Sequence, residues 1–238
     1  MELAPEEFAA AAAEVAATAA GLIQPGMRLG LGSGRMASAF IEALRPRIGA
    51  GLRVQGLCAS KLTESLAIDV GIELLSASGG ALDLDVDGAD EFDAALNLVK
   101  GGGGAMLREK VLAQRSRRFW VLADSSKKVD QLGSTHPLPV EVLPYDWSGT
   151  AARCAARLFC QPELRGAAEG PYLTDNGNYV LDLHFQSGLS DPGAASDLLS
   201  EIAGVLGHGL FLGLATAAIV FDAGHVRTLG ELDAERNP

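Results

Sequence analysis

Two neighbouring stretches of the chain contain residue types that could move protons during a reaction. Residues 87–91 read Asp-Gly-Ala-Asp-Glu, and residues 100–104 read Lys-Gly-Gly-Gly-Gly. Glu109 follows a few positions later, between two basic residues. Carboxylates can accept and return protons, a lysine can stabilise a negatively charged oxygen, and glycines let the backbone approach a ligand closely. This concentration of chemistry exceeds what a packing core requires and predicts an active site.

Each acid in these stretches also has a structural interpretation. Asp90 could cap the first turn of a helix, Asp87 could be a solvated strand end, and Glu109 could belong to a solvated helix face of mixed charge. The glycines are harder to explain structurally, because each adds an entropic cost and no packing. We therefore expect the backbone of residues 101–104 to approach a ligand.

A metal site is a poor interpretation of these residues. Counted from Asp85, glycine falls at the fourth position of a candidate calcium loop, whereas an EF-hand needs it at the sixth. His136, His184, His208 and His225 are scattered without the spacing of metal ligands, so we expect structural or surface roles for them. No metal site is predicted.

A further candidate site is the Gly-Leu-Gly-Ser-Gly loop of residues 30–34, which follows a short apolar run and precedes a helical pattern. Its backbone N–H groups and the start of the helix could bind a phosphate, although a tight strand-to-helix turn would also explain the glycines. Arg35 stands where a dinucleotide fingerprint needs glycine, and the loop is not a Walker sequence. Lys127 follows another predicted strand and could either bind an anion or face water.

The composition is that of an ordinary globular protein, with 48% apolar and 21% charged residues among 238. The formal net charge of −11 opposes binding to nucleic acid or to an anionic membrane surface. Cys58, Cys154 and Cys160 lack the paired spacing of a zinc or redox site, so reduced and mostly buried thiols are expected. We recognise neither a signal peptide nor a spanning helix, and we expect a cytoplasmic protein.

Strand-like and helical segments alternate through the first part of the chain. We predict helices over residues 5–20, 36–44, 62–68 and 105–114, and strands over residues 29–31, 54–58, 72–75, 82–87 and 119–123. In the strand 82–87, leucine and valine alternate with three aspartates, which would place the acids on one face. The alternation predicts an α/β fold with a mainly parallel, doubly wound, Rossmann-like sheet. Ligands of such sheets bind at the carboxyl ends of the strands, where the polar glycine loops emerge.

The pattern changes after about residue 132. Strands over 140–143 and 181–185 and helices over 151–159 and 194–202 predict a smaller inserted α+β lobe, of ferredoxin-like type, comprising residues 133–206. The catalytic α/β domain would then comprise residues 1–132 and 207–238. We expect the chain to return to the first sheet through residues 209–212, 217–221 and 226–229.

Taken in order, these motifs resemble the type A family of ribose-5-phosphate isomerases along nearly the whole chain. The resemblance rests on the glycine loop near Gly30, the Asp-Gly-Ala-Asp-Glu run, and the lysine–glycine run with Arg-Glu-Lys after it. It continues through Lys127 in a Ser-Lys context, Leu-Pro-Val-Glu-Val at 138–142, Thr-Asp-Asn-Gly-Asn at 174–178 and Gly-Leu-Phe at 209–211. It implies interconversion of D-ribose 5-phosphate and D-ribulose 5-phosphate, without metal or organic cofactor, by a homodimer or homotetramer.

The resemblance also implies a role for each candidate residue. Glu109 is expected to be the base that moves a proton from C2 to C1 of the open-chain sugar through a cis-enediolate. Asp87 and Asp90 would hold sugar hydroxyls and assist ring opening, while Lys100 and the amides of residues 101–103 would stabilise the oxyanion. The residues expected to bind the sugar phosphate are Ser33, Gly34, Arg35, Met36, Asp87, Gly88, Ala89, Asp90, Lys100, Gly101, Gly102, Gly103 and Lys127.

The chain departs from the family pattern at the expected phosphate site. Relatives usually carry Gly-Thr-Gly-Ser-Thr where this chain has Gly-Ser-Gly-Arg-Met at residues 32–36, and some have a lysine in the first helix where this chain has alanines at 9–13. We hypothesise that Arg35 replaces the lost phosphate contact, because its planar fork suits phosphate geometry. Alternatively, Arg35 faces solvent, and Ser33, the Gly34 amide and Lys127 hold the phosphate.

Two other functions remain open at this point. The altered loop would permit isomerisation of a different aldose phosphate. A sugar-phosphate sensor without catalytic activity could also retain the fold, although a binding protein has no need for a proton-transfer base.

Overall fold

The structure, a computed structural model, describes residues 4–167 and 170–236. These residues form two compact units. Unit 1 comprises Met1–Ala89, Arg108–Lys128 and Gly213–Pro238, and unit 2 comprises Asp90–Leu107 and Val129–Leu212. The predicted division differs from this one, because it assigned residues 90–107, 129–132 and 207–212 to the larger domain.

Unit 1 is built on a seven-stranded sheet with the strand order β16-β15-β7-β4-β1-β2-β3. All neighbouring strands are parallel except β15 and β16, which form an antiparallel pair at one edge. The strands are β1 (Arg28–Leu31), β2 (Gln55–Cys58), β3 (Glu73–Leu74), β4 (Leu82–Gly88), β7 (Ser116–Asp124), β15 (Ala217–Asp222) and β16 (His225–Gly230). The mainly parallel α/β architecture predicted from the sequence is therefore confirmed.

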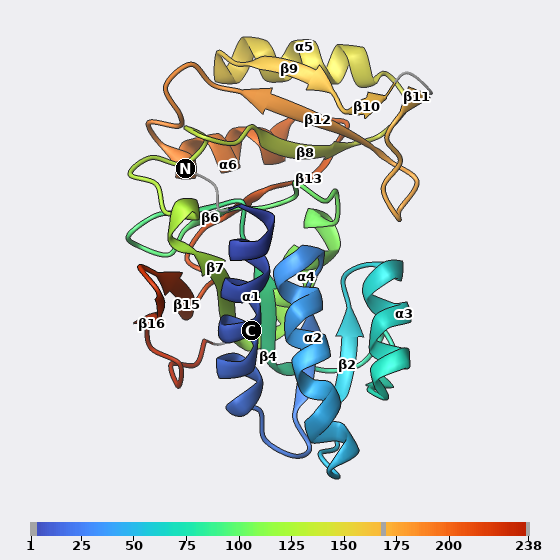
Figure 1. Cartoon of the computed structure of the whole chain (residues 1–238). Coiled ribbons are helices and arrows are strands. Elements are labelled where there is room, and N and C mark those ends of the chain that lie inside the picture. Colours follow the sequence, from blue (N-terminus) through green and yellow to red (C-terminus); the bar gives the residue numbers. More distant parts are fainter. Residues whose placement is uncertain (1–3, 168–169, 237–238) are drawn as a thin grey trace. The chain divides into compact units, whose positions relative to one another are not determined.

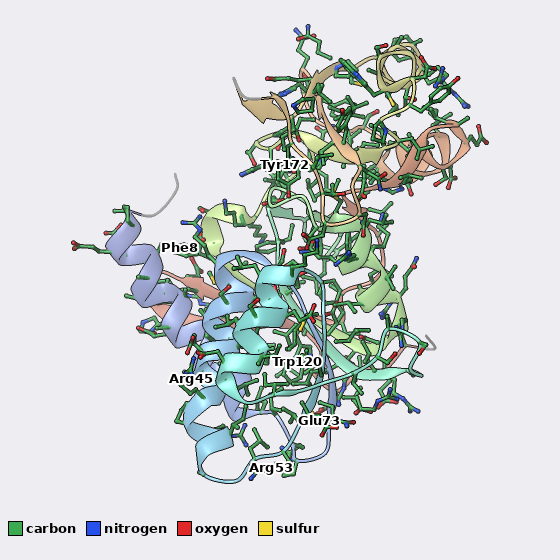
Figure 2. All side chains as sticks on the ribbon, turned by 90° about the vertical axis from the view of Figure 1, so that its right-hand side faces the viewer. Phe8, Arg45, Arg53, Glu73, Trp120 and Tyr172 are labelled. Atoms are coloured by element: carbon green, nitrogen blue, oxygen red, sulfur yellow. The ribbon has the colours of Figure 1, made fainter. Side chains whose placement is uncertain are left out.

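Helices α1 (Pro5–Gly21) and α2 (Gly34–Gly49) pack together along this sheet (Figure 1). The buried face of α1 consists of five alanines and Val15, and such small side chains allow the two helices to approach closely. Trp120 of β7 packs in the same core, and its indole nitrogen donates to the backbone oxygen of Leu232 (Figure 2). The remaining helices associated with this unit are α3 (Lys61–Val70), α4 (Met106–Arg115) and the short η1 (Ser125–Lys127).

Strand β4 is buried on both of its faces. Leu84 and Val86 belong to the core formed with α1 and α2, as the period-two pattern predicts. Asp85 and Asp87 point the other way, yet both are about 1% exposed. A central strand of a doubly wound sheet is covered on both faces, so the acids that alternate along it are buried rather than solvated.

Unit 2 contains a four-stranded antiparallel sheet with the order β13-β8-β12-β9. Its elements follow one another as β8 (Leu138–Val142), α5 (Trp147–Leu158), β9 (Gln161–Leu164), β12 (Tyr179–His184), α6 (Pro192–Glu201) and β13 (Val205–His208). This is the predicted ferredoxin-like arrangement, with two strands, β9 and β13, for which the sequence pattern gave no residue range. A short hairpin of β10 (Gly166–Ala167) and β11 (Gly170–Pro171) lies between β9 and β12 in the chain.

A second, three-stranded sheet in unit 2 corrects one prediction. Strand β14 (Leu210–Phe211) pairs with β6 (Leu98–Val99), which in turn pairs with β5 (Glu91–Phe92). The prediction that residues 209–212 return to the large sheet was therefore wrong. Strands of two residues are too short to produce a periodic pattern that would indicate which sheet they join.

Two buried glutamates hold loops of unit 2 in place. Glu91 accepts hydrogen bonds from the backbone N–H groups of Gly133, Thr135 and His136. Glu141 accepts from the side chains of a turn at residues 174–178, at distances of 2.7–3.0 Å. The Leu-Pro-Val-Glu-Val and Thr-Asp-Asn-Gly-Asn motifs are thus two sides of one structural contact.

Replacing Glu141 with Gln should destabilise unit 2. The carboxylate is fully buried, and its Oε1 accepts from Thr174, Asn176 and Asn178, so removing the charge weakens three charge-assisted hydrogen bonds. We expect the free energy of unfolding in urea to fall by about 1–3 kcal/mol. The control is Glu163→Gln, because the Glu163 side chain is 74% exposed in the same unit. Equal stability of the two variants would contradict this account.

Candidate active site

The glycines of the first loop make room for two acids of the neighbouring strand. In the parallel register of β1 and β4, Gly30 lies opposite Asp85. A Cβ at Gly30 would lie 2.5 Å from Asp85 Oδ1, and one at Gly32 would lie 2.0 Å from Asp87 Cγ. Both distances are far below van der Waals contact, so neither position accepts a side chain while the carboxylates stay where they are.

Ser33 connects two of the predicted catalytic acids. Its hydroxyl donates to Glu109 Oε1 at 2.6 Å, and its backbone N–H donates to Asp87 Oδ1 at 3.1 Å. Asp87 Oδ1 also accepts from the N–H of Gly88 at 2.7 Å. Glu109, on α4, and Asp87, at the end of β4, therefore share one residue as hydrogen-bond donor.

Glu109 and Asp87 are both withdrawn from solvent, with exposures of 3% and 1%. The alternative interpretations of Glu109 as part of a solvated helix face and of Asp87 as a solvated strand end were therefore wrong. Next to Glu109 on α4, burial lowers the pKa of the Lys110 ammonium to about 8. A carboxylate in such surroundings loses water as a partner and depends on the donors that the protein supplies.

The start of α2 lies directly after Ser33. Ser33 occupies the N-cap position but does not cap the helix, because its hydroxyl is engaged by Glu109. Gly34 has a positive φ of 80°, Arg35 is exposed, and Met36 is buried in the core of unit 1. Of these residues, Met36 could reach a ligand through its backbone N–H alone, at a helix end that favours anions.

Arg35 stacks on an aromatic ring. Its guanidinium carbon lies 4.0 Å from the centroid of Phe8, which is near the N-terminal end of α1 (Figure 2). Neither of the two alternatives given for Arg35, a phosphate contact or a side chain facing solvent, included this stacking contact. The N–H donors of a guanidinium lie around its edge, so stacking on a ring leaves it able to bind an anion.

Three neighbouring parallel strands carry the predicted residues of unit 1. Ser33 follows β1, Asp87 and Gly88 end β4, and Lys127 lies in η1 directly after β7. Since β7, β4 and β1 are adjacent and parallel, their carboxyl ends share one edge of the sheet. Ala89 ends the first segment of unit 1. This is the edge at which open α/β sheets bind ligands.

Unit 2 contains the other predicted residues. Asp90 accepts a hydrogen bond from the backbone N–H of Gly102 at 2.7 Å, and its own N–H donates to the carbonyl of Val99. Strand β5 follows Asp90, so its interpretation as a helix cap was wrong. The contact joins the acidic run to the glycine run within one unit.

Lys100 is 3% exposed and lies at the end of β6. Its Nζ is 5.6 Å from the centroid of the Phe211 ring, and its backbone N–H donates to the carbonyl of Gly209 at 2.9 Å. An ammonium over an aromatic face is stabilised as a cation. The Gly-Leu-Phe motif at 209–211 thus supports Lys100 through both backbone and ring.

Protein contacts account for three of the four glycines in the run. A Cβ at Gly101 would lie 2.9 Å from Met106, one at Gly102 would lie 2.7 Å from Asp90, and one at Gly104 would lie 2.5 Å from the Tyr172 ring. Gly101 and Gly104 also have positive φ angles of 106° and 79°. The loop is therefore folded tightly against its own unit.

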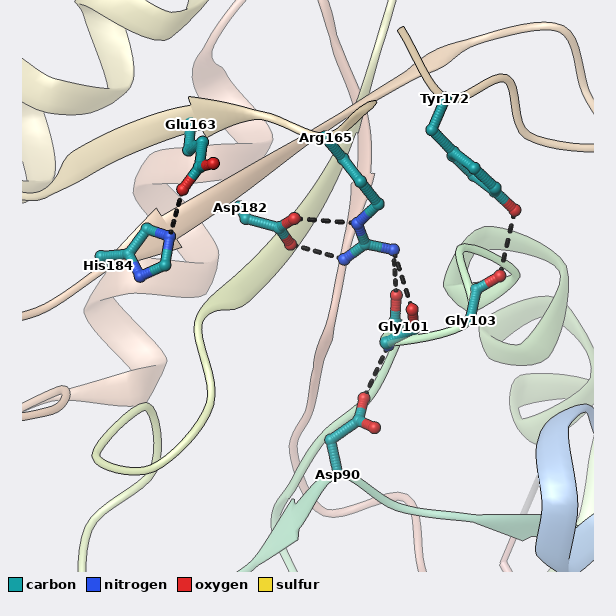
Figure 3. A network of polar contacts seen from close by, with 9 residues as sticks. Asp90, Gly101, Gly103, Glu163, Arg165, Tyr172, Asp182 and His184 are labelled. Atoms are coloured by element: carbon teal, nitrogen blue, oxygen red, sulfur yellow. Dashed lines mark hydrogen bonds and ion pairs between the residues drawn. The ribbon is translucent and has the colours of Figure 1, made fainter. Parts of the chain in front are cut away.

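Three residues that sequence reasoning missed surround this loop. Arg165, paired with Asp182, donates to the carbonyls of Gly101 and Gly102, and Tyr172 donates to the carbonyl of Gly103 (Figure 3). None of them belongs to a recognisable motif. The one signal was Asp182, an acid between two leucines of strand β12.

No group of three or more histidines, cysteines, aspartates or glutamates in residues 4–167 and 170–236 is arranged to hold a metal ion. Over the same residues, no helix has both the length and the apolar character needed to cross a membrane.

Comparison with known proteins agrees with this geometry. The family model for ribose 5-phosphate isomerase A (phosphoriboisomerase A) matches residues 55–224. The chain is 41% identical over 222 residues to a ribose-5-phosphate isomerase A of Sinorhizobium fredii, covering 91% of this chain and 95% of that protein. Among solved structures, ribose 5-phosphate isomerase from Plasmodium falciparum superposes with a TM-score of 0.89 at 30% identity, covering 92% and 97% of the two chains.

A second solved structure adds a ligand. It is a D-ribose-5-phosphate isomerase in complex with phospho-erythronic acid, with a TM-score of 0.87 and 34% identity, and the match covers 92% of this chain and 98% of that one.

Replacing Gly32 with Ala should damage stability and turnover together. The new Cβ would overlap the Asp87 carboxylate, so either the strand or the acid must move. We expect the free energy of unfolding to fall by about 1–3 kcal/mol. Gly21→Ala is the control, because nothing lies within 4 Å of a Cβ at Gly21. The argument fails if Gly32→Ala is as stable and active as that control in denaturation and turnover assays.

Proposed function

The chain belongs to the ribose 5-phosphate isomerase A family, and we propose that it interconverts D-ribose 5-phosphate and D-ribulose 5-phosphate. This reaction is an aldose–ketose isomerisation. The base takes the proton from C2 of the open-chain aldose, the electrons form a cis-enediolate, and the base returns the proton to C1. One further proton passes from O2 to O1, so atoms and charge balance.

Glu109 is the proposed base. The observation that carries this assignment is its hydrogen bond from Ser33, which aims one oxygen of a buried carboxylate and links it to Asp87. A carboxylate held in a fixed direction can act as a general base on a C–H bond that is placed within its reach.

Lys100 and the glycine run are proposed to stabilise the oxygens of the enediolate. The buried ammonium supplies positive charge where negative charge develops, and a site that excludes water strengthens that interaction. Because the Gly102 N–H is donated to Asp90, we assign the oxyanion contact to the amides of Gly101 and Gly103. Asp87 and Asp90 are proposed to hold sugar hydroxyls and to assist ring opening.

The phosphate is proposed to bind at the start of α2. Positive helix-dipole charge, the backbone N–H groups of Gly34, Arg35 and Met36, and the Lys127 ammonium supply anion-binding chemistry there. The hydroxyl and the backbone N–H of Ser33 are engaged by Glu109 and Asp87, so we assign the phosphate contacts to the other groups. Arg35 supplies the extra cation, oriented by Phe8.

A different aldose phosphate is the second candidate substrate. The observation that favours it is the Arg-Met pair at residues 35–36, where the family usually has two small hydroxyl residues. A panel of aldose phosphates assayed with the purified protein separates the two substrates. A binding protein without activity is disfavoured by the aimed and buried Glu109.

We also propose the pathway, the cellular compartment and the oligomeric state of the enzyme. Its reaction belongs to the non-oxidative branch of the pentose phosphate pathway, and we propose a cytoplasmic homodimer or homotetramer. The three cysteines are free, and burial raises the pKa of the Cys58 thiol to about 12 and those of Cys154 and Cys160 to about 11. Such unreactive thiols are compatible with a reducing compartment.

Glu109→Gln tests the proposed reaction. The amide keeps the shape of the side chain but cannot accept the proton, so kcat for ketose formation should fall on the order of 10²–10⁴-fold. The assay is run with a chelator, which tests metal independence in the same experiment. Glu64→Gln, an exposed glutamate of α3, is the control and should retain activity. Wild-type turnover by Glu109→Gln would overturn the assignment of the base.

Arg35→Ala tests the phosphate assignment. Loss of the guanidinium should raise the KM for ribose 5-phosphate about ten-fold, the cost of one charge-assisted phosphate contact, while kcat changes little. Arg45→Ala is the matched control, because Arg45 lies on the same helix and pairs with Glu42 and Asp69 instead. An unchanged KM in Arg35→Ala would place Arg35 outside the phosphate site.

A further inference from the structure

Arg165 binds the glycine run through its side chain. It follows β9, and its Nη1 donates to the carbonyl of Gly101 at 2.8 Å and to that of Gly102 at 3.1 Å (Figure 3). One cationic nitrogen thus orients two consecutive peptide groups. The Gly101 carbonyl also accepts from the backbone N–H of Gly104 at 2.9 Å, in a turn, and neither carbonyl belongs to a helix or to a strand ladder.

Asp182 holds the guanidinium in place. Its two carboxylate oxygens accept from Nε and Nη2 of Arg165, and the distance from Nε to Oδ2 is 2.8 Å. The side chains are only 19% and 14% exposed, and the backbone N–H of Arg165 donates to Val180. A bidentate pair of this kind has one geometry, so Nη1 points toward the loop and is not free to rotate.

Because these peptide bonds are trans, a contact that fixes a carbonyl also fixes the direction of the N–H group in the same peptide. In a trans peptide, C=O and N–H point in opposite directions, so fixing the carbonyls of Gly101 and Gly102 also fixes the N–H groups of Gly102 and Gly103. The Gly102 N–H meets Asp90 at 2.7 Å on the opposite side from Arg165. That peptide is held at both ends.

Tyr172 completes the arrangement. Its hydroxyl donates to the carbonyl of Gly103 at 3.0 Å, its ring lies where a Cβ at Gly104 would be, and the Arg165 guanidinium lies 5.9 Å from the ring centroid. Three consecutive carbonyls of the run, those of residues 101–103, therefore accept hydrogen bonds from side chains of unit 2.

We propose that Arg165, fixed by Asp182, is a positioning residue for the isomerisation, which orients and polarises the Gly103 amide, one of the two glycine-run amides assigned to the enediolate oxygen. A hydrogen bond from a cation draws electron density from the peptide and strengthens the N–H on its other side as a donor. The inference rests on the proposed function. Arg165 itself acts through the backbone and does not touch the substrate.

The test compares Arg165→Met with Arg157→Met. Methionine keeps the apolar stem but removes every donor, and the control removes an ion pair of the same unit, Arg157 with Glu201, away from the loop. We measure kcat, KM and the inhibition constants of two probes. Phospho-erythronic acid carries a carboxylate that can occupy the enediolate position, whereas inorganic phosphate lacks it.

Arg165→Met should lower kcat on the order of 10–100-fold, as misplaced catalytic groups do. The inhibition constant of phospho-erythronic acid should rise by a similar factor, while the KM and the constant for inorganic phosphate stay near the wild-type values. Arg165→Lys should recover part of kcat, because a lysine keeps one donor but lacks the planar fork. Arg157→Met should match the wild type in all four constants.

Two results would overturn the proposal. One is an unchanged kcat in Arg165→Met, and the other is an equal rise for both probes, which a merely structural role would produce. If Arg165→Met does not fold, Tyr172→Phe and Asp182→Asn decide by the same comparison, since each removes part of the arrangement. A wild-type protein without isomerase activity would reject the proposed function instead, so the two failures are distinguishable.

Discussion

Two carboxylates buried next to the same serine are the constraint on which unit 1 depends. Glu109 and Asp87 come from different elements, and each would be unstable in an apolar interior without donors. Ser33 satisfies one oxygen of each, one with its hydroxyl and the other with its amide. That arrangement requires β1 beside β4, a loop without side chains at Gly30 and Gly32, and α4 placed so that Glu109 reaches the loop.

The two glycine-rich loops use the absence of a Cβ for the same physical purpose. In the first, Gly30 and Gly32 leave space for Asp85 and Asp87. In the second, residues 101, 102 and 104 leave space for side chains from their own unit. Glycine costs backbone entropy in both places. It also lets charged neighbours come close enough to hold the polar groups of the backbone in fixed directions. Pre-organisation of this kind is what oxyanion stabilisation requires.

The sequence predicted much of the architecture but few of the hydrogen bonds between buried polar groups. Long periodic segments such as α1 and α2, and the alternation of strands with helices, identified the doubly wound sheet because burial imposes those periods. The two-residue strands β5, β6 and β14 left no period to detect, so residues 209–212 were assigned to the wrong sheet. The domain division shifted for the same reason, since these strands place residues 90–107 in unit 2.

The residue types at 87–91, 100–104 and 109 by themselves predicted proton-transfer chemistry, because a packing core has little use for such a cluster. The motifs in order also identified the family. Only the tertiary structure decided which donors each acid meets: that Ser33 binds Glu109, that Glu91 anchors a loop, and that Arg165 reaches the glycine run from a distant strand. Hydrogen-bond partners are chosen by distance and direction in space, and neither quantity is written in the spacing of residues along a chain.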